Sequence, residues 1–181
     1  MMIIIAPGFH SPHLTADFLQ GMGWQSLTQE EFLVIPLEIP PYDRISIYQW
    51  LSQQVSLETP LYFIAFSAGV VGAMGVAIIW QQQGGKIEHF FALDGWGVPV
   101  LPFFPTTRIS HDLLTHYTSQ LLGTGEQPFY CSPPIDHLAL WQNPHLAYGW
   151  WEIKCGCKLY SSVAKIISEI ILRKLLLNNK L

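Results

Sequence analysis

The stretch FIAFSAGVVG, Phe63–Gly72, places a single hydroxyl between two very different kinds of sequence. Before it, Leu61–Phe66 is a continuous apolar run, which is typical of a strand buried on both faces of a parallel sheet. After it, residues 68–85 are rich in small and apolar side chains and end in two glycines, which predicts a buried helix with a glycine stop. Ser67 therefore sits at a strand-to-helix turn.

The residues around Ser67 fit a sharp turn of this kind. A strand and a helix that meet at one residue nearly touch, so the neighbours two positions away must be small, and Ala65 and Gly69 are. The start of the helix also offers free backbone N–H groups and positive potential beside the serine. We expect the N–H of Ala68 to point at any negative charge that develops there.

The rest of the chain alternates between strand and helix patterns. Apolar runs predict strands within residues 2–8, 31–41, 61–67, 86–95 and 128–137. Helical patterns fall at residues 13–22, 42–56, 68–85, 110–123 and 161–177. This alternation favours an α/β fold, a three-layer sandwich in which helices cover both faces of a mostly parallel central sheet. We expect one domain over residues 1–181, with residues 98–127 as a candidate short lid or insertion.

Two of the predicted helices carry recognisable start signals. Asp43 is the expected N-cap of the helix over residues 42–56. Ser110 is the expected N-cap of the helix over residues 110–123, which Gly123 would end.

Composition excludes several classes of protein. Half of the 181 residues are apolar and 12% are charged, so we expect a large core and little disorder. The net charge is −4, and the scattered basic residues do not predict a nucleic-acid binder.

No apolar stretch reaches the ~20 residues of a transmembrane segment, and no signal peptide is recognisable. The three cysteines are odd in number and lack zinc-site spacing, so we expect a cytoplasmic protein with no metal or other cofactor. Its oligomeric state stays open.

Ligands of parallel α/β sheets bind beyond the carboxyl ends of the strands. The polar residues that follow predicted strands directly are His10, Ser67, Asp94, Asp136 and His137. We expect these side chains to gather at one edge of the sheet.

The segment AFSAG, Ala65–Gly69, resembles the G-x-S-x-G nucleophile elbow of the α/β-hydrolase superfamily, with Ala65 in place of the first glycine. The order of elements is similar over most of the chain. The resemblance implies that Ser67 is a nucleophile and that a histidine after the last strand is its base. His137 occupies that place. His111 and His116, by contrast, fall on one predicted helix, where surface or capping roles are expected.

The acid that orients the histidine has three candidates. Asp94 is preferred because it ends the strand after the elbow unit, and Gly95 lets the backbone turn there. Asp136 is the rival, although its carboxylate would have difficulty reaching the ring of the adjacent His137. Asp112 is the third choice.

The segment APGFH after the first strand looks like the oxyanion loop of the same superfamily. We expect the backbone N–H groups of Phe9 and Ala68 to form the oxyanion hole. The residues expected to border the substrate are His10, Trp96, Phe103 and Phe104.

The resemblance to small, lid-poor esterases and thioesterases implies a function. The chain would hydrolyse a small-molecule carboxylic ester or thioester through an acyl-Ser67 intermediate, with His137 as general base. Two alternatives stay open: a non-catalytic protein of the same fold with an incomplete triad, used for binding or scaffolding, and an acyltransferase. A nucleotide-binding domain is disfavoured, because APGFHSPH lacks a glycine-rich phosphate loop.

Overall fold

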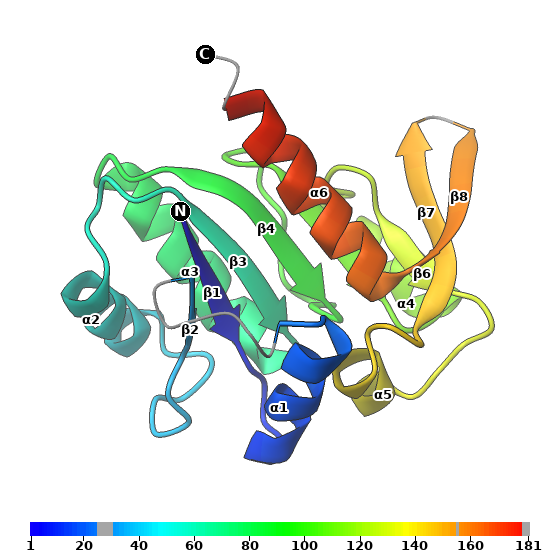
Figure 1. Ribbon diagram of the computed structural model, residues 1–181, viewed down its shortest axis with the longest axis horizontal. Coiled ribbons are helices and arrows are strands. Elements are labelled where there is room, and N and C mark those ends of the chain that lie inside the picture. The colour runs from blue at the N-terminus through cyan, green and yellow to red at the C-terminus, as the bar shows by residue number, and fades with distance from the viewer. Residues whose placement is uncertain (25–30, 155, 179–181) are drawn as a thin grey trace.

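A computed structural model of the chain describes residues 1–24, 31–154 and 156–178 (Figure 1). The strands in this part of the chain are β1 (Met2–Ala6), β2 (Phe32–Val34), β3 (Leu61–Phe66), β4 (Ile87–Leu93), β5 (Thr106–Ser110), β6 (Phe129–Cys131), β7 (Tyr148–Lys154) and β8 (Cys157–Ser162). The helices are α1 (Pro12–Gly21), α2 (Arg44–Gln54), α3 (Ala68–Gln82), α4 (Leu113–Gln120), α5 (His137–Gln142) and α6 (Val163–Asn178).

All the described strands join one sheet, in the order β2-β1-β3-β4-β5-β6-β7-β8. Neighbouring strands from β2 to β6 run parallel, whereas β7 is antiparallel to both β6 and β8. The chain runs from β1 outward to β2, returns to β3 on the other side of β1, and then continues outward through β4. Because β1, β3, β4 and β5 are parallel, their carboxyl ends lie at one edge of the sheet. This mostly parallel sheet with helices on its faces confirms the predicted α/β class.

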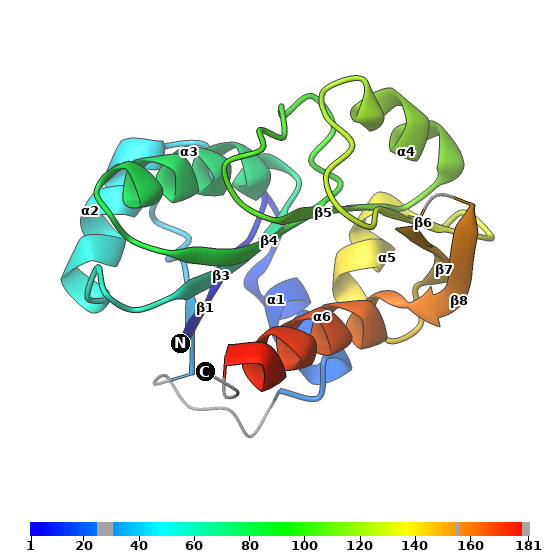
Figure 2. The ribbon, with the colours of Figure 1, turned by 90° about the horizontal axis from the view of Figure 1, so that it is seen from above.

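Helices cover the sheet on two sides: α2 and α3 pack on one face, and α1 and α6 pack on the other (Figure 2). The side chains of β3 alternate between the two cores. Phe63 and Ala65 face α2 and α3, and Tyr62, Ile64 and Phe66 face α1, α5 and α6. Burial on both faces explains why the strand is apolar at every position.

Several sequence expectations need correction. The strands β5, β7 and β8 were not predicted, and β5 is an interior strand of the sheet that lies inside the range 98–127. Part of the proposed lid is therefore core. Ser110 ends β5 and is not a helix cap; Asp112 caps α4 instead, by accepting a hydrogen bond from the backbone N–H of Thr115 at 2.6 Å.

The expected cap of α2 is present. The Asp43 carboxylate accepts hydrogen bonds from the backbone N–H groups of Ile45 and Ser46 at 3.0 and 3.2 Å. Among the helices that the structure describes, none combines the length and the apolar character needed to cross a membrane.

Candidate active site

Ser67 lies at the junction of β3 and α3, in a backbone conformation that few L-residues adopt. Its φ is 52° and its ψ is −124°, and such a residue typically costs about 1–3 kcal/mol of strain. Hydrogen bonds on both sides hold the turn: the N–H of Ser67 donates to the carbonyl of Leu93 at 2.9 Å, and the N–H of Val70 donates to the carbonyl of Ser67 at 3.1 Å. The hydroxyl is thereby presented at the carboxyl edge of the sheet.

Gly69, two residues after the serine, must be small because the backbone of the loop after β1 packs closely against it. A Cβ atom at Gly69 would clash with the carbonyl oxygens of Ala6 and Pro7, at the end of β1. The first turn of α3 therefore rests directly on the loop after β1. This contact gives the physical reason for the small residue at position 69.

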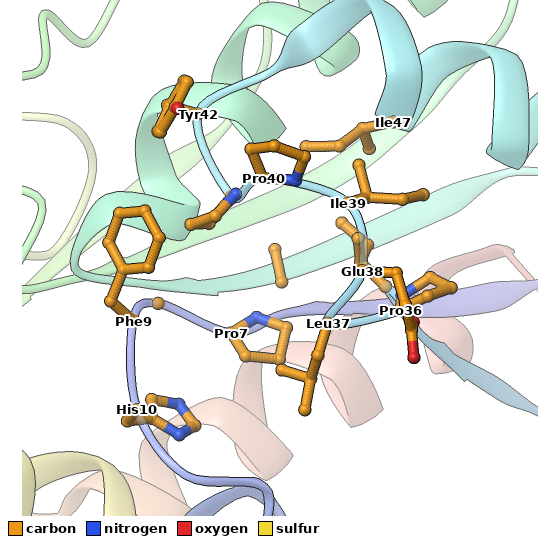
Figure 3. Close-up of a pocket in the computed structure, with 14 residues that line it drawn as sticks. Pro7, Phe9, His10, Pro36, Leu37, Glu38, Ile39, Pro40, Tyr42 and Ile47 are labelled. Atoms are coloured by element: carbon orange, nitrogen blue, oxygen red, sulfur yellow. The ribbon is translucent and has the colours of Figure 1, made fainter.

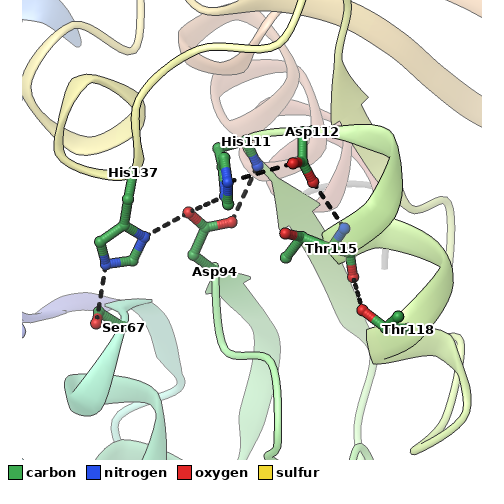
Figure 4. A network of polar contacts seen from close by, with 7 residues as sticks. All are labelled: Ser67, Asp94, His111, Asp112, Thr115, Thr118 and His137. Carbon is green, nitrogen blue, oxygen red and sulfur yellow. Dashed lines mark hydrogen bonds and ion pairs between the residues drawn. The ribbon is translucent and has the colours of Figure 1, made fainter.

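A chain of three side chains runs from Ser67 into the protein (Figure 4). Nε2 of His137 lies 3.1 Å from Oγ of Ser67, and Nδ1 of His137 lies 2.7 Å from Oδ2 of Asp94. The Asp94 side chain is fully buried, with 0% of its surface exposed. A carboxylate only accepts hydrogen bonds, so Nδ1 of His137 carries the proton and Nε2 is free to accept the serine proton.

His137 reaches this position from an unexpected element. It is the first residue of α5, a short helix that precedes two further strands, and its ring stacks on Phe66 at a centroid distance of 4.6 Å. The two rival acids lie elsewhere: Asp136 precedes α5 as its N-cap residue, and Asp112 caps α4.

His111 is a member of the site that sequence reasoning missed. It follows β5 directly, and its backbone N–H donates to Oδ1 of Asp94 at 2.9 Å while its ring Nδ1 lies 2.8 Å from Oδ2. Asp94 therefore holds two imidazoles (Figure 4). The available signal was its place just past a strand, but that strand was itself missed, and His111 was assigned to the following helix.

The charges around His111 favour its protonated form. The hydrogen bond to Asp94 raises the pKa of the His111 ring above its ordinary value of 6.5, although burial works against the charge. Burial also raises the pKa of the Asp112 carboxyl, but hydrogen bonds from Thr115 and the nearby His111 leave it below its ordinary value.

Within the described residues, Asp94, His111 and His137 are also the group whose ligand atoms come close enough for a metal ion, all within 4.8 Å of one another. Both ring nitrogens point their protons at the same carboxylate oxygen. These hydrogen bonds account for the close approach of the three side chains.

A cavity of about 580 Å³ opens in front of the Ser67 hydroxyl. Besides the residues of the site, it is lined by Ala68, Val71, Trp96, Val98 and Thr115. Trp96 is 65% exposed, so its ring is available to a bound molecule. Ala68, Val71, Trp96 and Val98 give the lining an apolar part that suits an uncharged group.

A buried arginine fixes the loop that carries Trp96. The Arg108 guanidinium of β5 donates to the carbonyls of Gly95 and Val98 on one side, and to those of Leu122 and Gly123 on the other. Burial lowers the pKa of Arg108 to about 10, so the group stays charged at neutral pH. The cation thus ties this wall of the cavity to the loop after α4.

The other two aromatic residues expected at the substrate lie apart from Ser67. Phe104 is buried in the core under α3, with its ring 6.0 Å from that of Phe90. Phe103 lines a separate cavity formed by residues 100–106 and 123–126. The proline-rich segment returns the chain to the start of β5. It therefore places Phe104 in the core and Phe103 in the separate cavity.

A third cavity, of about 350 Å³, lies between the loop after β1 and the loop over residues 35–42 (Figure 3). Phe9 and His10 line it, and the Phe9 ring lies 6.0 Å from the ring of Tyr42. A Cβ atom built on Gly8 would lie 3.0 Å from the Cβ of Ser67 and 3.5 Å from the backbone N of Ala68. The APGFH loop therefore adjoins the serine, while the roles expected of Phe9 and His10 stay predictions.

Comparisons with known proteins add one finding. No family model matches the chain, and no curated protein matches it. The solved structure of YbtT, a type II thioesterase from the yersiniabactin NRPS/PKS biosynthetic pathway, is similar to it, with a TM-score of 0.55. The match covers 80% of this chain and 88% of that chain at 12% sequence identity, which shows a shared fold.

Proposed function

We propose that this chain, which has the α/β-hydrolase fold, is a serine hydrolase that cleaves a carboxylic ester or thioester. One observation carries the proposal: a strained serine at a strand-to-helix turn lies 3.1 Å from an imidazole whose other nitrogen lies 2.7 Å from a buried carboxylate. A serine hydroxyl is a weak nucleophile until such a base takes its proton.

The proposed reaction begins with attack of Ser67 Oγ on the substrate carbonyl carbon while Nε2 of His137 takes the hydroxyl proton. Asp94 holds the ring in the required tautomer and stabilises the imidazolium that forms. The bond to the leaving oxygen or sulfur then breaks, and His137 returns the proton to the leaving group. Water attacks the acyl-Ser67 ester by the same route in reverse, which releases the acid and restores the enzyme.

The negatively charged oxygen of the tetrahedral intermediate must be stabilised by hydrogen-bond donors. We assign this role to the backbone N–H groups of Ala68, at the start of α3, and Phe9, in the adjoining loop. Support comes from the position of Gly8, where an added Cβ would lie 3.0 Å from Cβ of Ser67 and 3.5 Å from the backbone N of Ala68, and from the unpaired N–H groups of a helix's first turn. Donors of this kind are typically worth about 2.7–4 kcal/mol of transition-state stabilisation.

The substrate we propose is a small acyl ester or thioester whose apolar part lies against Trp96 and Val98. The apolar lining of the 580 Å³ cavity and the fold shared with a type II thioesterase support this class. We also propose a thiol-reducing compartment such as the cytoplasm, which the free thiols of Cys131 and Cys157 support; Cys155 lies outside the described residues.

Hydrolysis of p-nitrophenyl esters and acyl thioesters of increasing chain length tests the proposal. We expect Ser67→Ala and His137→Ala to lower kcat/KM by ~10³-fold or more. Ser52→Ala, on the exposed face of α2, is the matched control and should retain the wild-type rate. A fluorophosphonate probe should label the wild type and Ser52→Ala and leave Ser67→Ala unlabelled. Equal rates in all variants, with no labelling at position 67, would reject the proposal.

The alternative of a non-catalytic protein required one of the three side chains to point away from the others. Their distances disfavour it. An acyltransferase would use the same groups, and product analysis with an added alcohol acceptor separates the two reactions.

A further inference from the structure

The buried carboxylate of Asp94 has two imidazole partners on one oxygen. Nδ1 of His137 lies 2.7 Å from Oδ2, and Nδ1 of His111 lies 2.8 Å from the same atom. The second oxygen accepts the backbone N–H of His111 at 2.9 Å. His111 therefore contacts both oxygens of the Asp94 carboxylate, and these two contacts hold the carboxylate in its orientation toward His137.

The surroundings of His111 identify its charge state. Its Nδ1 must carry a proton, because it faces a carboxylate, and its Nε2 faces Oδ2 of Asp112 at 3.5 Å. A neutral ring with the proton on Nδ1 would aim a lone pair at that second carboxylate. An imidazolium instead presents a proton to each.

The groups that act on the His111 charge come from three elements. Asp94 follows β4, Asp112 caps α4 and Asp136 precedes α5, and all three carboxylates favour the cation. The ring of His137, whose centroid is 6.0 Å away, is the opposing group. Two imidazoles that share one carboxylate titrate as a coupled pair, so a proton on one makes a proton on the other less favourable.

We propose that His111 is a positioning residue whose imidazolium shares the charge of Asp94 with His137 and so keeps His137 unprotonated, as the free base, down to lower pH. The inference rests on the proposed function only for its catalytic consequence. It predicts that removal of the His111 charge extends protonation of His137 to higher pH.

Titration of the imidazole rings by ¹H–¹⁵N NMR tests the coupling without any turnover. Single substitutions assign the ring signals. In the wild type we expect the His111 ring to stay protonated above pH 6.5. In His111→Gln, which keeps an amide donor but no charge, the midpoint of the His137 titration should move up by about one pH unit, as expected for a lost charge at about 6 Å under partial screening.

The control is His145→Gln, on an exposed ring that is not among the hydrogen-bond partners of Asp94 in the described part of the chain, and it should leave the His137 midpoint unchanged. Asp112→Asn is the second variant, since it removes a partner of His111 and leaves Asp94 in place. It should lower the pH at which His111 loses its proton. If His111→Gln fails to fold, this variant decides the question: an unchanged His111 midpoint overturns the proposal.

Kinetics supply the second readout. The acid limb of kcat/KM should move to higher pH in His111→Gln by the same amount as the His137 midpoint. A uniform loss of kcat with an unmoved limb would show a structural role and overturn the inference. Coupled ring titrations in a protein that hydrolyses no ester or thioester would support the charge sharing and count against the proposed function instead.

Discussion

At the scale of single residues, Asp94 and Asp136, the two main candidates for the acid, differ in their positions relative to His137. Asp94 is buried, has a positive φ of 49° and lies 2.7 Å from His137. Asp136 is the N-cap residue of α5, and its side chain makes no cap hydrogen bond. The roles of the two carboxylates are therefore open to a matched pair of substitutions.

Asp94→Asn should lower kcat by about 10³–10⁴-fold, because an amide at this position favours the wrong tautomer of His137. Asp136→Asn changes the same functional group one residue from His137 and should lower kcat by less than threefold. Ester hydrolysis at pH 8, with circular dichroism to check folding, measures both. The reverse order of effects would assign the acid to Asp136.

Most of the residues at the site were predictable from one rule, that polar side chains gather past the ends of parallel strands. Ser67 and Asp94 follow strands that are apolar enough to recognise, so their places were predicted. His137 was predicted from the same rule, although it begins a helix after β6. His111 was missed because the strand before it reads as polar, and Phe104 was misplaced because an aromatic ring near a site can equally fill the core.

At the scale of elements, the position of the serine depends on how closely α3 approaches β1. Gly69→Ala would drive a Cβ atom into the carbonyl oxygens of Ala6 and Pro7, which are backbone atoms with little freedom to move. We expect a loss of about 1–3 kcal/mol in the free energy of unfolding and a fall in kcat of tenfold or more as Ser67 shifts. Urea unfolding and ester hydrolysis measure the two effects.

Gly75→Ala is the matched control on the same helix. Its Cβ would lie 2.9 Å from both Cβ and Cδ of Arg44, so that side chain would have to shift, whereas the nearest atoms at Gly69 are backbone atoms at the end of β1 and in the loop after it. The gain in helix propensity offsets part of that contact, so the loss of stability should be smaller than in Gly69→Ala and kcat should not change. Equal losses in both variants would mean that the helix as a whole, and not its contact with β1, sets the position of Ser67.

The elements that sequence reasoning missed share a physical cause. β5 reads TTRIS, yet every residue is buried, because the Thr107 hydroxyl donates to the carbonyl of Glu126 and Arg108 donates to four carbonyls. Partners that distant in sequence cannot be read from a local pattern. β7 and β8 form an antiparallel hairpin at the edge, where exposed and buried positions mix and the continuous apolar signal of an interior strand is absent.

At the scale of the whole molecule, two histidines impose opposite pH dependence on stability. His111 has a raised pKa in the folded state. Its contribution to the free energy of unfolding is therefore fully present below about pH 6.5 and is lost as the pH rises through the pKa of the folded state. His89, in the centre of β4, is the reverse case. Burial first, and the charge of Lys174 second, lower its pKa to about 3.

His89 is neutral in the folded sheet, where its Nε2 donates to the Thr107 hydroxyl at 3.0 Å. The unfolded chain takes up a proton at this ring below pH 6.5, so the free energy of unfolding must fall as pH drops from 6.5 toward 3. His89→Leu keeps the volume and removes the titration. We expect the stability of the wild type relative to this variant to decline by roughly 1 kcal/mol per pH unit between pH 6 and pH 4, as measured by urea unfolding followed by tryptophan fluorescence. The exposed His13→Gln provides the control and should track the wild type throughout. The free energy of unfolding of the wild type minus that of His89→Leu could instead stay constant over this range. The acid sensitivity of the fold would then come from its carboxylates and not from the ring of His89.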